Sequence, residues 1–551
     1  MSTNQQQHPI DGPLDAEKRE VSVAVTAAED FEEKVEQVGK VPPPDGGYGW
    51  IVVIASFLVN MVVDGVIYTC NNTLGKGWTA RFGSEGASGL VVSLLTGCYY
   101  LCGPLAAALV NVFGVRPVAI FGSLLSTAGF LLASQTTSQW QTYLFYGVLG
   151  GIGFGCMYLP SIVVLSTYFE KRRSVATGIA VCGSGIGTVV FSQINPKIFV
   201  WLNSNSASFI LYIAALASSG AVFSLLFAPL KPSEQQVKKV AKMVRDYEGK
   251  PEEPTQKLLD DVRNDLEELN RPGHQTDTFF VGNNAPSLER RKSLDEKAAE
   301  VAHHVVHATE KHTVIHVAKK SKLALFKESM CSMLDKDLMF SPSFMTLAIS
   351  GIFTVMAFLV PFTLIKAMMI EMKGVDGKLL YTADQADFIL SLIGCFNIAF
   401  RILCGIASDH PKMSALQVSN SATIIGGIAM LFVPFCTEYW HFCLFTIPFS
   451  AGVACFAALR SVICVDLIGV EKLSNAFGIM MVFMGIGAAL GTPVAGTLKD
   501  VTGNYNVAFW LMGGVFIFSG VMTIRLKAIK QWEEERKAQR QGTEMRVLSQ
   551  Y

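Results

Sequence analysis

Charged residues are scarce in this chain. They make up 16% of its 551 residues, whereas a soluble globular protein has about a quarter. Lys and Arg together number 45 and so do Asp and Glu, so the net charge is zero and gives no reason to expect a nucleic-acid partner. Apolar runs recur instead, and a run of roughly 20 residues can cross the ~30 Å hydrocarbon core of a lipid bilayer as a helix. The composition predicts a protein that crosses the bilayer many times.

Several kinds of chemistry are also missing. The 12 Cys include no C-x-x-C pair of the kind that binds zinc, and we find no nucleophile–base pair, metal cage or Gly-rich phosphate loop. We therefore expect no enzyme activity, no cofactor and no metal. The first forty residues lack a short apolar core followed by a cleavage site, so we expect no signal peptide and a first span that is kept as an anchor.

Twelve apolar spans are predicted. They lie near 50–70, 87–110, 115–134, 141–168, 174–197, 207–229, 342–366, 384–407, 415–436, 440–465, 474–498 and 504–526. An even number places both termini and the polar segment between the two sets on one side. The basic flanks "KKVAKMVR", "KKSK" and "RLKAIKQWEEERKAQR" predict that this side is cytoplasmic. The expected parts are a tail (1–49), a six-helix bundle (50–230), a central loop (231–338), a second bundle (339–527) and a C-terminal tail (528–551).

The two sets of spans are related by an internal repeat. "SVATGIAVCGSGIG" (174–187) and "SNAFGIMMVFMGIG" (474–487) share seven of fourteen residues at an offset of 300. Each copy opens the fifth span of its set. A repeat in the same orientation after six spans is typical of two parallel six-helix bundles, so we predict an all-α membrane fold. Three glycines in the fourth span, Gly147, Gly151 and Gly155, are expected to let helices pack closely.

Five stretches resemble one family, the monocarboxylate transporters of the major facilitator superfamily. They are "PDGGYGW" (44–50), "YFEKRRSVATGIAVCGSGIG" (168–187), "NIAFRILCGIASD" (397–409), "DLIGVEKLSNAFG" (466–478) and "GTPVAGTLKDVTGNYNVAFW" (491–510). The entry signature consists of Asp45, Gly46, Gly47, Gly49 and Trp50. We also expect Asp45 to cap the first helix and Trp50 to lie at the membrane interface. The resemblance implies twelve transmembrane helices that carry a small carboxylate-bearing solute across the plasma membrane. Some family members need a single-span accessory glycoprotein, and no motif in this chain reports on that partner.

A polar stripe interrupts the first span. Asn60, Asp64 and Tyr68 are four residues apart and share one helix face. A carboxylate at membrane depth costs roughly 2.5–3.5 kcal/mol, so such a stripe is expected to face a water-filled cavity. The alternative for Asp64 is a structural hydrogen bond to a neighbouring helix. Asn397 and Arg401 form a similar stripe in the eighth span, and the alternative for Arg401 is snorkelling toward the cytoplasm.

The resemblance assigns roles to these positions. Arg401 matches the family arginine that pairs with the substrate carboxylate. Asn397 and Tyr68 stand where proton-coupled members carry an aspartate and a lysine. Neither residue changes charge between pH 5 and 8, which disfavours proton symport of the lactate type.

The charges of Asp64 and Arg401 cancel, which favours a substrate with both a carboxylate and a cationic or donor group, such as an amino acid, carnitine or a creatine-like compound. If Arg460 also faces the cavity, the sum is +1 and a simple anion fits. A proton-coupled monocarboxylate symporter and a non-transporting membrane sensor on the same fold are the alternatives. The predicted substrate-binding set is Asn60, Asp64, Tyr68, Asn397, Arg401 and Arg460.

Four further residues are predicted to act in gating or conformational change: Arg172, Arg173, Asp409 and Asp466. The alternative for the basic pair is a topology signal. Ser293 follows two arginines in "RRKSLDE" and is a candidate phosphorylation site in the central loop.

Overall fold

The computed structural model describes residues 34–35, 38–39, 41–136, 138–169, 172–247, 255–269, 326, 336–373, 379–408, 413–468 and 473–548. Within these ranges the chain is helical, and its only β-pairing is an isolated bridge between Lys373 and Leu379. The chain divides into two compact units. One contains every helix long and apolar enough to cross a membrane, and the other combines parts of the N-terminal tail and of the central segment.

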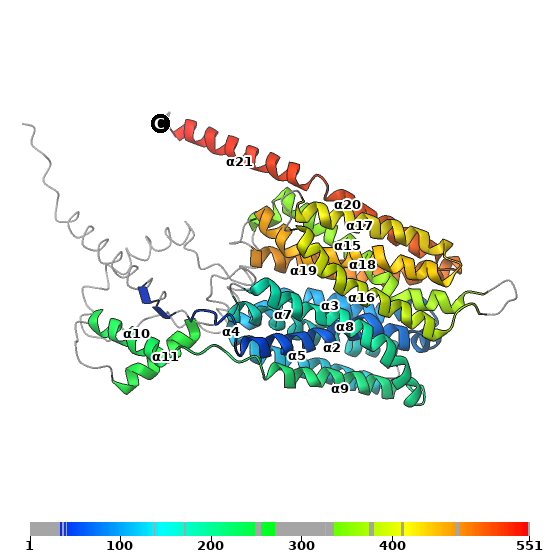
Figure 1. The fold of residues 1–551 in the computed structure, drawn as a ribbon, viewed down its shortest axis with the longest axis horizontal. Helices are drawn as coiled ribbons and strands as arrows, with labels where there is room; N and C mark the ends of the chain where they lie inside the picture. The colour runs from blue at the N-terminus through cyan, green and yellow to red at the C-terminus, as the bar shows by residue number, and fades with distance from the viewer. Residues whose placement is uncertain are drawn as a thin grey trace, which may run out of the picture. The chain divides into compact units, whose positions relative to one another are not determined.

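The membrane-spanning unit consists of two sets of helices, which we call the first and second halves (Figure 1). The first half contains α2 (Gly49–Phe82), α3 (Glu85–Leu101), α4 (Gly103–Phe113), α5 (Val115–Ser134), α6 (Gln139–Thr142), the π-helix η1 (Tyr143–Leu149), α7 (Gly150–Tyr168), α8 (Arg173–Trp201) and α9 (Ser206–Ser224). The second half contains α14 (Lys336–Met339), α15 (Pro342–Glu371), α16 (Ala383–Ser408), α17 (Ala415–Phe432), η3 (Val433–Phe435), α18 (Tyr439–Ile468), α19 (Leu473–Thr502) and α20 (Asn506–Met522). The C-terminal helix α21 covers Leu526–Leu548.

The predicted all-α membrane fold is confirmed. Among the described residues, eleven helices are long and apolar enough to span a bilayer, and α3 with α4, bent by 44°, makes a twelfth if the pair is one span. The bend lies where Pro104 enters the first turn of α4, because proline cannot donate a backbone hydrogen bond. The first span is longer than expected: α2 continues to Phe82 and ends at Gly83, whose φ of +75° is the left-handed conformation that glycine adopts most easily.

Glycines of the internal repeat bring equivalent helices together in the two halves. A Cβ on Gly187 would lie 2.3 Å from the Met61 carbonyl oxygen of α2, and a Cβ on Gly487 would lie 2.1 Å from the Ile352 carbonyl oxygen of α15. The predicted packing of Gly147, Gly151 and Gly155 is also confirmed, since a Cβ on each would lie within 2.7 Å of an atom of α3. The repeat therefore encodes close contacts of the first and fifth spans in each half.

Glycines also join the halves to each other. A Cβ on Gly185 of α8 would lie 2.4 Å from the Ile398 side chain of α16, and a Cβ on Gly485 of α19 would lie 2.7 Å from the Leu101 side chain of α3. Gly185 and Gly485 are again separated by 300 residues. The halves thus meet along two equivalent helix pairs, α8 with α16 and α3 with α19.

The smaller unit has its own apolar core. Helices α10 (Glu234–Tyr247) and α11 (Gln256–Leu269) bury one apolar face each, and Val35 of the N-terminal tail packs into the same core. The amide of Gln236 also donates to the Val38 carbonyl oxygen at 3.5 Å. The segment expected as a central loop therefore contains helices, and Val35 and Val38 of the N-terminal tail pack with them.

Candidate functional site

The entry signature forms a joint between the start of α2 and the turn from α7 to α8. Asp45 has a φ of +49°, its N–H donates to the Tyr168 carbonyl oxygen at 3.0 Å, and its carboxylate accepts from the Arg172 N–H at 3.4 Å. The expectation that Asp45 caps the first helix is wrong. Tyr48 occupies the capping position of α2 and makes no side-chain cap.

Aromatic packing completes this joint. The ring of Trp50 meets Phe169 edge-on at 5.1 Å between centroids. Gly49 lies against the same ring, because a Cβ there would come within 2.9 Å of it. The hydroxyl of Tyr48 donates to the Leu226 carbonyl oxygen at 3.0 Å. The signature therefore holds three segments of the first half together.

Asp64 lies in a cluster of tyrosines inside the membrane-spanning unit. Its side chain is buried, and the Tyr99 hydroxyl donates to its carboxylate at 3.3 Å. Tyr68, Tyr100 and Tyr158 lie near the same carboxylate. The Tyr99 ring lies 4.7 Å from Tyr100 and 5.2 Å from Tyr158. Tyrosines from α3 and α7 thus surround the one carboxylate of α2.

Arg401 crosses from the second half to the first. Its Nη1 donates to the Val181 carbonyl oxygen of α8 at 2.9 Å, whereas its buried Nε has no hydrogen-bond partner among the described residues. This hydrogen bond joins α16 of the second half to α8 of the first. Asn397, one turn earlier, is 5% exposed and makes no hydrogen bond through its side chain within the described part of the chain.

Arg460 belongs to the same neighbourhood. It lies near Tyr100 and Tyr158, as Arg401 does. Its Nη1 lies 3.0 Å from the Met484 sulfur, and Arg460 is one of the residues that line a cavity of about 20 Å³ within the second half. Arg401 also interacts with Asp64, although no direct ion pair joins those two described side chains. The cluster therefore contains one carboxylate and two guanidinium groups.

The other members of the predicted polar stripe point elsewhere. Asn60 is completely buried and donates to the Ser56 carbonyl oxygen and to the Ser161 hydroxyl, so in this conformation it joins α2 to α7. The Tyr68 ring stacks on Phe362 of α15 at 4.8 Å. The three residues of this helix face therefore have different partners: Asn60 packs against α7, Asp64 contacts the tyrosine cluster and Tyr68 contacts the second half.

The residues expected to act in gating are only partly described. Arg172 is exposed, and the Asp466 carbonyl oxygen accepts from Lys530 of α21 at 3.0 Å. The Arg173 side chain, Asp409 and Ser293 lie outside what the structure describes. Among the described residues, no group of three His, Cys, Asp or Glu side chains could hold a metal ion.

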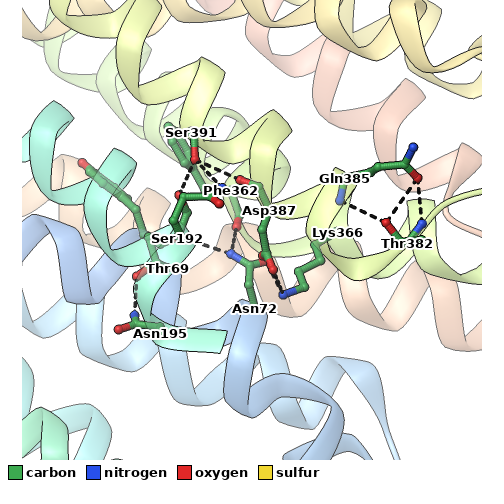
Figure 2. A network of polar contacts seen from close by, with 12 residues as sticks. Thr69, Asn72, Ser192, Asn195, Phe362, Lys366, Thr382, Gln385, Asp387 and Ser391 are labelled. Atoms are coloured by element: carbon green, nitrogen blue, oxygen red, sulfur yellow. Dashed lines mark hydrogen bonds and ion pairs between the residues drawn. The ribbon is translucent and has the colours of Figure 1, made fainter. Parts of the chain in front are cut away.

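The halves are joined at the membrane face where α2, α8, α15 and α19 end, which we call the opposite face. The face where these helices begin is the terminal face. Asn71 and Asn72 donate to the Thr363 and Phe362 carbonyl oxygens of α15 at 3.1 and 2.8 Å. The Ser192 and Ser391 hydroxyls lie 2.8 Å apart (Figure 2). These bonds close the opposite face between the halves.

A third contact at this face involves a helix terminus. Asp500, at the end of α19, accepts hydrogen bonds from the Ser84 hydroxyl and from the N–H groups of Glu85 and Gly86, at 2.6, 3.1 and 3.0 Å. A carboxylate from the second half therefore completes the cap of α3 in the first.

The sequence alone did not indicate which side chains surround Asp64. Tyr99, Tyr100 and Tyr158 carry no motif, and the adjacent tyrosines at 99 and 100 in an apolar span were the one available signal. Lys366 of α15 and Asp387 of α16 were also missed. They form a buried ion pair with Nζ–Oδ distances of 2.6 and 2.7 Å.

Comparison with known proteins shows which family the chain belongs to. The model of the Major Facilitator Superfamily matches residues 49–436 and 344–549. Monocarboxylate transporter 9 of Gallus gallus is 25% identical over 506 residues, covering 89% of this chain and 94% of the relative. Monocarboxylate transporter 1 of Bos taurus is 26% identical over 514 residues, covering 91% and 89%.

Solved structures show the same fold at low identity. The xylose transporter XylE from E. coli is 13% identical with a TM-score of 0.54, covering 86% of this chain and 98% of that one. A POT family transporter in complex with 5-aminolevulinic acid is 13% identical with a TM-score of 0.58, covering 90% and 99%. The chain therefore belongs to the major facilitator superfamily, and it is a multi-pass transporter, not an enzyme, that is similar to the monocarboxylate transporters.

Proposed function

We propose that this transporter carries a small organic solute with a carboxylate group across the plasma membrane by alternating access, and that Arg401 binds the carboxylate. The observation that carries this proposal is the buried Nε–H of Arg401, which lacks a partner although its Nη1 is bonded to Val181. A guanidinium can donate two parallel hydrogen bonds to a carboxylate, and a buried donor without an acceptor is costly. The names of the relatives agree with this substrate class.

The other end of the substrate meets the tyrosine cluster. Asp64 and the hydroxyls around it accept and donate hydrogen bonds, which suits a cationic or donor group of a zwitterion such as an amino acid, carnitine or a creatine-like compound. A second candidate is a simple anion. The observation that favours it is the proximity of Arg460 to Tyr100 and Tyr158, because a second guanidinium gives the cluster a net charge of +1.

We propose that transport is not coupled to protons in the way that lactate symport is. Tyr68 and Asn397 stay neutral between pH 5 and 8, so they cannot exchange a proton during the transport cycle. We propose facilitated diffusion or exchange. The basic flanks favour termini in the cytoplasm, which makes the opposite face the extracellular one.

Uptake of radiolabelled lactate, aromatic amino acids, carnitine and creatine at pH 6 and pH 7.5 tests the proposal. Arg401→Ala should reduce uptake of every transported acid at least tenfold, because a charge-assisted hydrogen bond contributes about 1.5–3 kcal/mol. Asp64→Asn should strongly reduce uptake of zwitterions and spare that of lactate, so this variant separates the two candidates. Unchanged uptake in Arg401→Ala, or no uptake of any acid by the wild type at normal surface expression, would refute the proposal. Uptake that rises steeply at pH 6 and survives in Asp64→Asn would refute the absence of proton coupling.

A further inference from the structure

The ion pair of Lys366 and Asp387 is the most deeply buried charge pair of the described chain. The side chains are 9% and 4% exposed, and Nζ contacts both carboxylate oxygens (Figure 2). Both residues belong to the second half, on α15 and α16. They lie outside the tyrosine cluster, and the proposed function gives them no role.

Stability alone does not explain such a pair. Removing two charges from water costs several kcal/mol per ion, and a well-packed apolar pair is often as stable or more so. Two neighbouring transmembrane helices could bury two apolar side chains at the same contact. Ionisable residues at membrane depth commonly mark the path of a substrate or ion, so the position of this pair decides what it can do.

The pair lies between two contacts that join the halves. Asn72 donates to the Phe362 carbonyl oxygen, and a helical carbonyl points toward the residue four positions later, which is Lys366. On α16, the Ser391 hydroxyl donates to the Asp387 carbonyl oxygen and also bonds the Ser192 hydroxyl of α8. The first half therefore contacts α15 and α16 within about one turn of the pair, from α2 and from α8. Separation of the halves at the opposite face would remove both contacts.

The pair of Lys366 and Asp387 lies between the tyrosine cluster and the opposite face. Along α2, Tyr68 is one turn beyond Asp64 and Asn72 is one turn further, a total of eight residues or about 12 Å. Tyr68 stacks on Phe362, and Lys366 is one turn beyond Phe362 on α15. A solute moving from the opposite face to Asp64 would meet Lys366 first and the ring pair of Tyr68 and Phe362 second.

We propose that Lys366 is a second recognition residue for the substrate carboxylate, reached when the opposite face opens, and that Asp387 is its counter-ion when that face is closed. The entering carboxylate takes the place of the Asp387 carboxylate at Nζ, and Asp387 stays ionised and is hydrated by the opened path. The ammonium group of Lys366 can donate three hydrogen bonds and gives two to Asp387 in the closed state. This inference rests on the proposed function, because it needs a substrate that bears a carboxylate.

Transport kinetics of variants in which the ion pair is altered test the role of Lys366. The variants are Lys366→Arg, Lys366→Gln, the swap Lys366→Asp with Asp387→Lys, and the apolar double variant Lys366→Met with Asp387→Leu. Radiolabelled lactate and carnitine serve as probes, in proteoliposomes of known orientation. We expect the swap and the apolar variant to fold with a wild-type melting temperature, because neither leaves a buried charge unpaired.

We expect the effect on KM to differ between entry through the opposite face and entry through the terminal face. KM for entry through the opposite face should rise about tenfold or more in the swap, in the apolar variant and in Lys366→Gln, with Vmax within about twofold of the wild type. KM for entry through the terminal face should not change, and Lys366→Arg should behave as the wild type. A swap that restores the wild-type KM would show that the pair is structural and overturn the inference, and so would an unchanged KM in Lys366→Gln.

Arg401→Ala run in parallel separates this inference from the function on which it rests. If Arg401→Ala loses uptake and the Lys366 variants do not change KM, only the present inference fails. If no acid is transported, or Arg401→Ala transports as the wild type does, the proposed function fails as well.

Discussion

Replacing Asp500 by alanine should open the opposite face of the membrane-spanning unit. The carboxylate of Asp500 accepts three hydrogen bonds from the first turn of α3, at 2.6, 3.0 and 3.1 Å, and these bonds join the two halves. They exist only while the opposite face is closed. Removing them therefore destabilises the closed conformation and leaves the open one unaffected.

The magnitude follows from the capping geometry. A lost N-terminal cap costs about 0.5–2 kcal/mol, and a negative charge at a helix N-terminus contributes about 0.3–1 kcal/mol where it is exposed to water. Asp500 lies at an exposed position, so water replaces part of what is lost. We expect a net change of about 1–2 kcal/mol, which corresponds to a rise of about 5–30-fold in the ratio of open to closed molecules.

Distance measurements between spin labels check this expectation. Lys76 of α2 and Leu380, which precedes α16, are both exposed near the opposite face and lie in different halves. Cysteines introduced there, in a variant without native cysteines, report the separation of the halves by double electron–electron resonance. In Asp500→Ala, the ratio of molecules with the longer label distance to those with the shorter one should rise by about 5–30-fold. Asp384→Ala, which removes another exposed carboxylate at this face, is the matched control. Identical distance distributions for Asp500→Ala and Asp384→Ala would refute the reasoning.

Two further substitutions test the packing of each unit. Gly187→Val should prevent accumulation of folded transporter, because its side chain would overlap the Met61 carbonyl oxygen, whereas Gly178→Val on the same helix has open space and should fold normally; equal size-exclusion profiles would contradict this. In the smaller unit, Val240→Asp buries a charge in the apolar core and should destabilise that unit by about 2 kcal/mol or more, seen as faster proteolysis, while Lys239→Asp on the exposed face serves as the control. Equal proteolysis of these two variants would argue against a common core of the tail and α10.

The architecture could be predicted because it depends on local patterns. A span is recorded in about twenty consecutive residues, and the repeat at 174–187 and 474–487 is visible in two short stretches. The structure confirms the spans to within a few residues at most ends. The exceptions have local causes, namely the break at Pro104 and the continuation of α2 to a left-handed Gly83.

The partners of the candidate site could not be predicted, because they come from distant parts of the chain. Asp64 and Arg401 were singled out as charges in apolar spans, but Tyr99 and Tyr158 are ordinary residues until the fold brings them to Asp64. Helical periodicity also says which residues share a face and not what that face meets. Asn60 has the same spacing from Asp64 as Tyr68 does, yet it packs against Ser161 of α7.

Two pairs of opposite charges in the membrane-spanning unit, Lys366 with Asp387 and Asp64 with Arg401, differ in how they respond to movement of the halves. Lys366 and Asp387 belong to the same half, so their separation is unchanged when the halves rock as rigid bodies. Asp64 and Arg401 belong to different halves, so their separation changes with every such movement. A zwitterion bound to both would draw the halves together, because its two ends are attracted to opposite sides of the contact. A simple anion would be bound by Arg401 without a matching attraction from Asp64. For a zwitterion, Asp64→Asn should therefore lower Vmax as well as raise KM, since the lost charge acts on the movement of the halves and not on binding alone.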